Sequence, residues 1–391
     1  LTDILKQLDL ILEANKSGLG SLNLLCIAAE LLLFTEERNG LKLTLIEELE
    51  AHLHPQYQLR LIDFVTQESD YGQFILTTHS TTLASKIPLR NLIICKNDQV
   101  FPLGTGTRLN PSDYNFLQRF LDATKANLFF AQGLIIVEGD AENLLIPTLA
   151  ELIDRPLHKY GVSVVNVGST AFKRYVRIFQ RMEGANMNIP IAIISDLDVR
   201  SMEYYEEKDM PKVVITDDAF VADLRKITSE VDYNNIPAFF VAKSTFEEFI
   251  SENKTVKRFK VQTGGKSVKS QLNEVYEAAQ QDITEEVITR LRNARREKLE
   301  KEWNDDRIKI FLPQNWTLEY EIACSDLYLK LEQAVRIARY EKNNPQKEID
   351  AGLFERIEQE VTSNFEGKDK TTKLSYEIFE LLCEGSVSKA S

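Results

Sequence analysis

Two short apolar runs that each end in acidic residues constrain this chain more than any other feature. LIIVEGDAENLL at residues 134–145 and IAIISDLDV at residues 191–199 begin with branched apolar side chains and end in carboxylates. Continuous apolar runs of this length are typical of strands buried in a parallel α/β sheet. Ligands of such sheets bind at the carboxyl ends of the strands. The two runs therefore predict one acidic cluster at a sheet edge.

The predicted cluster would repel itself unless a divalent cation bound to it. The first run contributes Glu138, Asp140 and Glu142, and the second contributes Asp196 and Asp198. We interpret these carboxylates as a Mg²⁺ or Mn²⁺ site. Each motif alone could instead supply the N-terminal caps of the helices that follow the strands.

The composition fits a soluble protein of two or three domains. The chain has 391 residues, of which 43% are hydrophobic and 27% are charged. Its formal net charge of −13 argues against general attraction to nucleic acid but is compatible with a local basic groove. The four cysteines show no CxxC spacing, so we expect reduced core thiols. Without an apolar run long enough for a bilayer or a visible signal peptide, we expect a cytoplasmic protein with no membrane partner.

Strands and helices alternate along the chain, which predicts an α/β fold with parallel sheets. Before residue 110 we expect a helix at 56–67 and buried strands at 41–49, 73–80 and 91–96. A second α/β unit begins at Leu134. Its helices are expected at about 141–153 and 170–183, and its strands at 134–138, 162–167, 191–196, 212–215 and 237–242.

Residues 267–305 differ from both units because they combine helical spacing with many opposite charges. This pattern favours a helical insertion whose charged face is solvated. The alternative is an arm that contacts DNA through four arginines, namely Arg290, Arg292, Arg295 and Arg296.

LTLIEELEAHLHP at residues 43–55 places two carboxylates at the end of an apolar strand. The segment resembles the Walker B motif of ABC-type ATPases. That chemistry needs one carboxylate to hold Mg²⁺ and a neighbour to polarise the attacking water. By this resemblance Glu47 holds the metal and Glu48 is the base.

Two further segments resemble parts of the same ATPase. THS at residues 78–80 resembles the switch segment, which implies that His79 lies near the γ-phosphate. SGLGSLNLLCIAAELL at residues 17–32 resembles the signature segment, in which Ser17 and Gly18 would meet the phosphate of a nucleotide on the partner subunit.

The phosphate-binding loop of such an ATPase has no counterpart in this sequence, because no GxxxxGK[ST] string occurs. We therefore expect that this chain does not hydrolyse ATP alone, and that ATP binds to the complete ATPase domain. The chain begins at Leu1 rather than Met, so we expect the C-terminal part of an ATPase whose N-terminal lobe is not in this sequence.

VEGDAENLL followed by ISDLD resembles the Toprim domain of type II topoisomerases, primases and some nucleases. On this match Glu138 is the first acid, and Asp196 and Asp198 are the acidic pair. An ABC-type ATPase followed by a Toprim domain is the layout of the OLD (overcoming lysogenisation defect) family, which includes the nuclease of the Gabija phage-defence system. The resemblance extends from about residue 17 to about residue 380.

The resemblance to the OLD family implies further site residues. A second acid one helical turn after the first falls on Glu142, and a TLE segment within residues 316–323 supplies Glu319, with Glu247 as its rival. A lysine near the C-terminus is also implied. Among Lys368, Lys370 and Lys373 we favour Lys373, and Lys243 is the alternative.

The implied activity is hydrolysis of phosphodiester bonds in double-stranded DNA with two metal ions, regulated by the ATPase domain. The resemblance also implies a homodimer or larger assembly through the ATPase domain and a helicase-like or other defence-system partner. A non-cleaving nucleotide-sensing scaffold or DNA-binding regulator is the alternative function. A topoisomerase- or primase-like enzyme is the third.

The domain organisation follows from these matches. We expect the C-terminal part of an ABC-type ATPase domain at residues 1–110 and a helical connector at 111–133. A Toprim nuclease domain with a helical insertion at about 267–305 would occupy residues 134–391.

Overall fold

The computed structural model describes residues 27, 29, 43–68, 72–228, 239–240, 267–303, 305–347, 349–365 and 371–383. The chain divides into two compact units, residues 1–191 and 192–391. Several predicted site residues lie outside the described residues, namely Ser17, Gly18, Lys243, Glu247, Lys368 and Lys370.

From residue 43 onward, the first unit has the strand–helix–strand arrangement that the sequence predicted. Strand β1 (Leu43–Ile46) pairs in parallel with β2 (Gln73–Leu76), and helices α3 (Pro55–Glu68) and α4 (Thr81–Lys86) accompany them. Their shared core contains Leu49, Leu61 and Leu83. β2 ends earlier than predicted because the Ser80 hydroxyl caps α4 by accepting a hydrogen bond from the Leu83 amide.

The strand predicted at 91–96 is present as β3 (Ile93–Lys96), but its expected place in a parallel sheet is wrong. It forms an antiparallel hairpin with β4 (Gln99–Pro102). The two residues between them, Asn97 and Asp98, have φ values of 51° and 56°. Two consecutive positive φ angles make the type I′ turn that closes tight hairpins. Cys95 in β3 is exposed, so the expectation of a core thiol is also wrong there.

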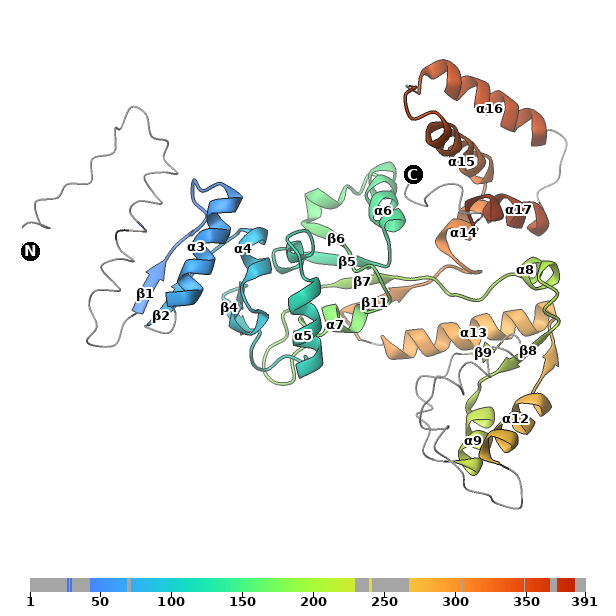
Figure 1. Cartoon of the computed structure of the whole chain (residues 1–391), viewed down its shortest axis with the longest axis horizontal. Helices are drawn as coiled ribbons and strands as arrows, with labels where there is room; N and C mark the ends of the chain where they lie inside the picture. Colours follow the sequence, from blue (N-terminus) through green and yellow to red (C-terminus); the bar gives the residue numbers. More distant parts are fainter. Residues whose placement is uncertain are drawn as a thin grey trace, which may run out of the picture. The chain divides into compact units, whose positions relative to one another are not determined.

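A helical segment joins the hairpin to the next sheet. It contains α5 (Pro111–Phe120) and the 3₁₀ helix η2 (Lys125–Phe129). Asn110 and Asp113 form a capping box at the start of α5. Asp113 is only 2% exposed, and its carboxylate forms ion pairs with Arg177 at 2.9 Å and Arg174 at 3.8 Å. Because Arg174 belongs to helix α7 (Phe172–Val176) and Arg177 is its C-cap, these pairs fix α5 against α7 (Figure 1).

The central sheet carries the predicted acidic motifs. β5 (Gly133–Val137) pairs in parallel with β6 (Val162–Asn166), and the sheet order is β11-β7-β5-β6, with β7 at Ile191–Ile194 and β11 at Ile308–Phe311. α6 (Asp140–Leu152) follows β5 directly, and η3 (Leu157–Tyr160) precedes β6. The helix expected at 170–183 is reduced to α7 (Phe172–Val176).

The second unit contains a separate antiparallel sheet in the order β10-β8-β9. Its strands are β8 (Lys212–Ile215), β9 (Phe239–Phe240) and β10 (Gln281–Asp282). Helices α9 (Asp218–Ile227) and α12 (Val268–Ala278) pack on it around Val214, Phe240 and Tyr276. The sequence predicted β8 and β9 as strands but did not separate them from the sheet that carries the acids.

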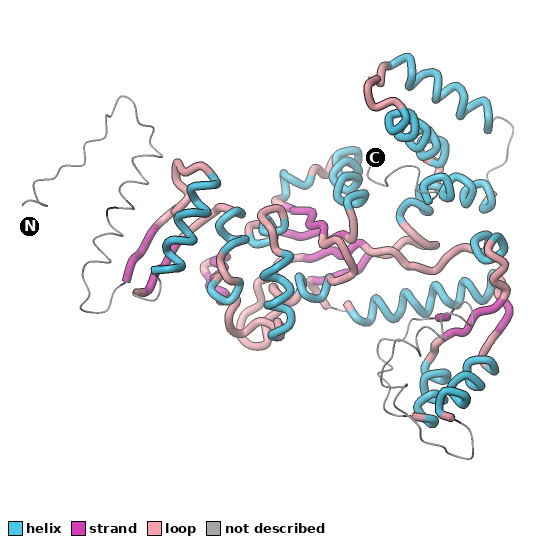
Figure 2. The backbone as a smooth tube through the Cα atoms, viewed as in Figure 1, coloured by secondary structure: helices cyan, strands magenta, loops and turns pink. Residues whose placement is uncertain are grey.

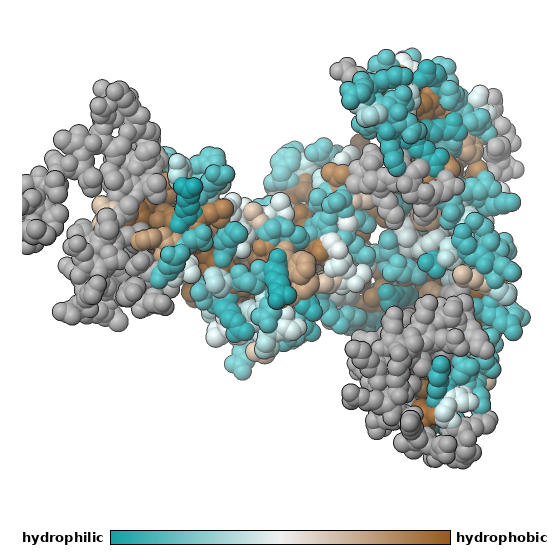
Figure 3. Space-filling model, viewed as in Figure 1, coloured by the Kyte–Doolittle hydropathy of each residue, from teal (hydrophilic) through white to brown (hydrophobic). Residues whose placement is uncertain are grey.

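Helices make up most of the remaining second unit (Figure 2). α8 (Met202–Glu207) and α13 (Glu285–Glu302) precede β11. After β11 come α14 (Leu318–Cys324), α15 (Tyr328–Asn343), α16 (Ala351–Phe365) and α17 (Thr372–Cys383). Hydrophilic residues cover most of the visible face of α15 and α16, while α16 buries Leu353, Ile357 and Val361 (Figure 3). Among the described residues, no helix has the length and apolar character needed to cross a membrane.

Removing the Asp113 carboxylate should destabilise the first unit. Asp113→Ala leaves Arg174 and Arg177 without their buried partner and breaks the capping box of α5. Because both arginines are about one-third exposed, we expect a loss of about 2 kcal/mol in the free energy of unfolding. Urea unfolding followed by circular dichroism measures this. Asp113→Asn, which keeps a capping acceptor but no charge, should lose less; an unchanged midpoint for Asp113→Ala contradicts the prediction.

Candidate active site

The first acidic motif forms the junction between β5 and α6. Glu138 follows the last residue of β5 and is half-buried. Glu142 lies in the first turn of α6, is 9% exposed, and its Oε2 accepts a hydrogen bond from the Gly139 amide at 3.1 Å. This contact caps the helix, and acids in a first turn interact favourably with the helix dipole. A Cβ atom on Gly139 would lie 3.1 Å from Glu142 Oε2, so glycine leaves room for this contact.

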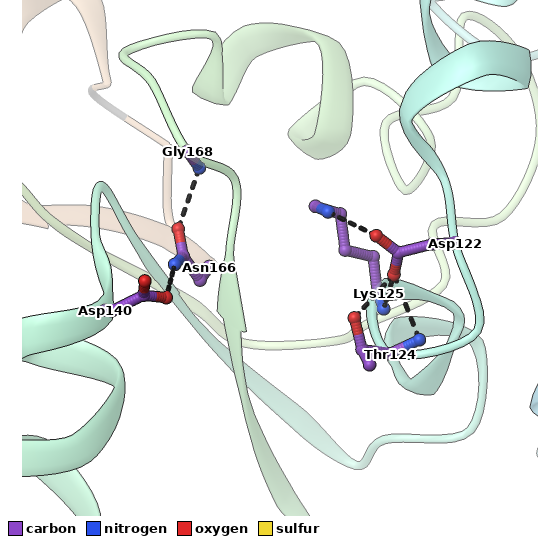
Figure 4. Close-up of polar contacts among 6 residues, drawn as sticks. All are labelled: Asp122, Thr124, Lys125, Asp140, Asn166 and Gly168. Atoms are coloured by element: carbon purple, nitrogen blue, oxygen red, sulfur yellow. Dashed lines mark hydrogen bonds and ion pairs between the residues drawn. The ribbon is translucent and has the colours of Figure 1, made fainter.

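The third acid of this motif, Asp140, is held by the end of the neighbouring strand. Asn166 Nδ2 donates to Asp140 Oδ1 at 2.6 Å, and Asn166 Oδ1 accepts from the Gly168 amide at 2.8 Å (Figure 4). The sequence reasoning missed Asn166. The available signal was a polar side chain at the end of the strand that pairs with β5.

In the turn between α5 and η2, the carboxylate of Asp122 accepts several hydrogen bonds. Asp122 Oδ2 accepts from Lys125 Nζ at 2.6 Å, and Asp122 Oδ1 accepts from the Thr124 hydroxyl and amide (Figure 4). Burial raises the pKa of Asp122, but these hydrogen bonds and the Lys125 charge outweigh it and lower the pKa to about 2. Asp122 is therefore an anchored structural carboxylate.

The second acidic motif is joined to the TLE segment by three hydrogen bonds. Asp196 Oδ1 accepts from the Leu318 amide at 3.0 Å. The amides of Leu197 and Asp198 both donate to the Trp316 carbonyl, at 2.9 and 3.4 Å. Asp198 has a φ of 58°, and its exposed carboxylate lies 4.0 Å from Arg295 Nη2. Aspartate is among the residues that tolerate this left-handed conformation.

Glu319 lies in the first turn of α14, which Thr317 caps by accepting from the Tyr320 amide. Its side chain is 8% exposed. Since Asp196 binds the amide of Leu318, the residue next to Glu319, the structure brings the acidic pair and the TLE segment together. In the sequence, only the family resemblance linked these segments, which lie more than 100 residues apart.

Lys373 is exposed in the first turn of α17. α17 packs against α14, and the Phe379 ring lies 4.7 Å from the Trp316 ring and 5.5 Å from the Tyr320 ring, centroid to centroid. The Tyr376 hydroxyl is also within hydrogen-bonding distance of Glu207 Oε2, at 2.8 Å. These contacts fix the helix of Lys373 on the helix of Glu319.

The predicted carboxylates do not form a closed metal cage in the described part of the chain, where no group of three or more His, Cys, Asp or Glu side chains is placed to hold an ion. Glu142 and Asp196 turn toward backbone amides, and Asp198 turns toward a guanidinium. The donor set still fits Mg²⁺ or Mn²⁺, which prefer oxygen ligands. Glu142 and Glu319 are each more than 90% buried, and Glu142 accepts the hydrogen bond from the Gly139 amide.

In the ATPase-like segment, Glu47 and Glu48 are exposed after β1. The Glu48 amide donates to Thr77 Oγ1 at 3.0 Å. The sequence reasoning missed the third acid, Glu50, whose carboxylate accepts from the Thr78 hydroxyl at 2.6 Å and from the His79 amide at 2.5 Å. Glu50 therefore fastens the segment that contains His79 to the segment that contains Glu47 and Glu48.

Two family models match the chain. Residues 129–198 match the Toprim domain of overcoming lysogenization defect protein-like proteins, and residues 3–84 match an AAA ATPase domain. These matches and the described sheets agree with the predicted α/β fold, in which an ATPase segment precedes a Toprim domain.

The chain is also similar to curated proteins. It is 27% identical over 219 residues to endonuclease GajA of Bacillus cereus strain HuB5-5, a match that covers 47% of this chain and 31% of the relative. Identity to endonuclease GajA of strain VD045 is 26% over 132 residues, covering 34% and 23%. Identity to the retron Ec83 probable ATPase of Escherichia coli is 36% over 70 residues, covering 18% and 13%. The matches thus span less than a third of each relative.

Similar solved structures are C-terminal regions of OLD proteins. The one from Burkholderia pseudomallei has a TM-score of 0.28 and 20% identity, covering 67% of this chain and 84% of that chain. One from Xanthomonas campestris pv. campestris has a TM-score of 0.25 and 18% identity, covering 67% and 84%.

Glu50 should make the stability of the ATPase-like segment depend on pH. Burial raises the pKa of Glu50, but hydrogen bonds from Thr78 and His79 outweigh it and hold the pKa below the usual 4.5. A carboxyl whose pKa is lower in the folded state stabilises the fold above the unfolded pKa, and this contribution is lost as the pH falls through the folded pKa. Because the side chain is partly exposed, we expect Glu50→Gln to cost about 1 kcal/mol at pH 7.

Thermal unfolding at pH 7 and pH 4 measures this effect. The difference between Glu50→Gln and the wild-type chain should shrink at pH 4. The control is Asp63→Asn, which changes an exposed acid of α3. A difference that is the same at both pH values would show that the Glu50 charge has no such role.

Proposed function

Because this chain carries an OLD-like Toprim domain, we propose that it is a metal-dependent DNA endonuclease or nickase. The observation that carries the proposal is the hydrogen bond of 3.0 Å between Asp196 Oδ1 and the Leu318 amide, which holds the acidic pair beside Glu319. The similarity to two proteins named endonuclease GajA supports the reaction type.

The metal ligands in this proposal come from three segments. They are Glu138, Glu142, Asp196, Asp198 and Glu319. The Toprim match over residues 129–198 contains four of these five residues and supports the proposal that they act together. Carboxyl ends of neighbouring strands are where α/β sheets bind ligands.

Two Mg²⁺ or Mn²⁺ ions bound there would activate the attacking water and stabilise the leaving 3′ oxygen. The protein's own contribution is to hold the carboxylates in place. Glu142 is fixed by the Gly139 amide, and Asp196 by the Leu318 amide. The exposed Lys373 would neutralise charge that builds on the phosphate in the transition state.

The ATPase segment would regulate this activity. Glu47, Glu48, His79, Ser17 and Gly18 would act on ATP in a complete ATPase domain, and such domains dimerise around nucleotide. A homodimer or larger homo-oligomer, a helicase-like or other defence-system partner, a role in phage defence and a cytoplasmic location complete the proposal. The AAA match over residues 3–84 supports the nucleotide-linked part.

A second candidate function is a nucleotide-sensing scaffold that binds DNA without cutting it. The similarity of 36% over 70 residues to a retron probable ATPase supports only the nucleotide-sensing part of this function. Loss of a key acid would be its signature, but Glu138, Glu142, Asp196 and Asp198 are all present.

A plasmid assay separates the two functions. With supercoiled DNA and Mg²⁺ or Mn²⁺, the wild-type chain should produce nicked or linear product, and EDTA should abolish it. Glu138→Ala and Asp198→Ala should each reduce the rate by at least about 100-fold, because each removes a metal ligand. Glu206→Ala, which changes an exposed acid near the end of α8, is the control. Intact plasmid with every metal, together with retained DNA binding, would favour the scaffold.

The lysine assignment has its own test. Lys373→Ala should abolish cutting while leaving Mn²⁺ binding, measured by calorimetry, close to that of the wild-type chain. Lys243→Ala is the comparison. If Lys243→Ala abolishes cutting and Lys373→Ala does not, the assignment of Lys373 is wrong.

A further inference from the structure

Helix α13 packs directly on the acidic pair. Its buried residues Ile288 and Leu291 share a core with Leu197 and Val199, the two neighbours of Asp198. The Arg296 guanidinium also donates to the Pro313 carbonyl at 2.8 Å, in the segment that leads from β11 to α14. One side of α13 is therefore fixed next to both Asp198 and the approach to Glu319.

The four arginines of α13 do not all lie on one solvent-exposed face of the helix. Arg292, Arg295 and Arg296 are spaced by three and four residues, so they share the face that packs toward Asp198. Arg290 lies on the other side of the helix and donates to Gln281 on β10. Both sequence interpretations of this segment, a solvated face or an arm of four arginines, need this correction.

The contact between Arg295 and Asp198 is loose. The guanidinium lies 4.0 Å from the carboxylate, and the two side chains are 27% and 60% exposed. Exposed pairs at this distance contribute little to stability. Arg292 Nε, one turn away, is buried and has no hydrogen-bond partner in the described part of the chain. Positive charge is thus concentrated beside an acidic site in a chain of net charge −13.

We propose that Arg295 binds a backbone phosphate of DNA next to Asp198, with Arg296 as the residue that positions α13. This inference rests on the proposed DNA-cutting function. Guanidinium groups present parallel N–H donors that match two phosphate oxygens. Cations held by the carboxylates would compete with Arg295 for Asp198 and would leave the guanidinium available to a phosphate. Arg295 then supplies a second positive group, distinct from Lys373.

DNA binding without cutting tests this role. Binding of a fluorescein-labelled duplex is measured by anisotropy in Ca²⁺ between 50 and 200 mM salt, with circular dichroism melts for each variant. Arg295→Ala should weaken binding about 10-fold and reduce the slope of log Kd against log salt by about 1, because one phosphate contact is lost. Arg295→Lys, which keeps the charge but not the planar donors, should lose about 3-fold.

The matched control is Lys301→Ala, which removes one positive charge from an exposed position of the same helix. It should leave the slope unchanged. If Arg295→Ala melts early, Arg295→Gln replaces it. The inference is overturned if the Arg295 variants bind DNA with the affinity and salt slope of the wild-type chain. This holds even if these variants no longer cut DNA, because Arg295 would then act only through Asp198.

The outcome for the endonuclease proposal is separate. If the wild-type chain binds DNA but does not cut it with any metal, the endonuclease proposal is contradicted. The DNA affinities of the Arg295 variants still test the inference in that case. A wild-type chain that binds no DNA at any salt concentration overturns the inference itself.

Discussion

The hydrogen bond from the Leu318 amide to Asp196 is the constraint on which the proposed site depends. It joins the end of β7 to the start of α14, and the Trp316 carbonyl reinforces it by accepting from Leu197 and Asp198. A carboxylate at the start of a helix binds an amide that would otherwise lack a partner and interacts favourably with the helix dipole. The same contact that caps α14 therefore determines where Glu319 lies relative to the acidic pair.

Apolar packing then extends this arrangement to the C-terminus of the described chain. Trp316 and Tyr320 contact Phe379, so α17 is fixed on α14. On the other side, Leu197 and Val199 share a core with α13. Lys373 and Arg295 thus lie on two helices that pack against the segments of Glu319 and of the acidic pair, although neither is near the acids in sequence.

The sequence predicted what local patterns encode. β1, β2, β5, β6 and β7 appear where apolar runs placed them, and α3 and α6 follow from helical spacing. Pairing was harder to predict. β3 forms a hairpin with β4 because Asn97 and Asp98 adopt positive φ angles. β8 is not part of the sheet that contains β5, since it pairs with β9 and β10 instead. An apolar run indicates a strand, but only long-range contacts decide which strand lies beside it.

Sequence motifs carry most of the proposed site. Glu138, Glu142, Asp196 and Asp198 were predicted from strand ends, and Glu319 and Lys373 only from a family resemblance. Asn166, Glu50 and Arg295 were missed or left in a larger group because their roles depend on contacts between distant segments. Asn166 at the end of β6 binds Asp140 at the start of α6, and Glu50, which precedes α3 in the chain, binds the Thr78–His79 segment, which follows β2. Local patterns in a single sequence do not predict contacts between segments that are distant along the chain.

The separate sheet of β8, β9 and β10 has a consequence for how the site assembles. It lies between β7 and β11 in the chain and has its own core around Val214, Phe240 and Tyr276. Closing a long flexible loop between Asp196 and Leu318 would cost conformational entropy. An insertion that folds on its own contacts shortens the effective loop before the two ends meet.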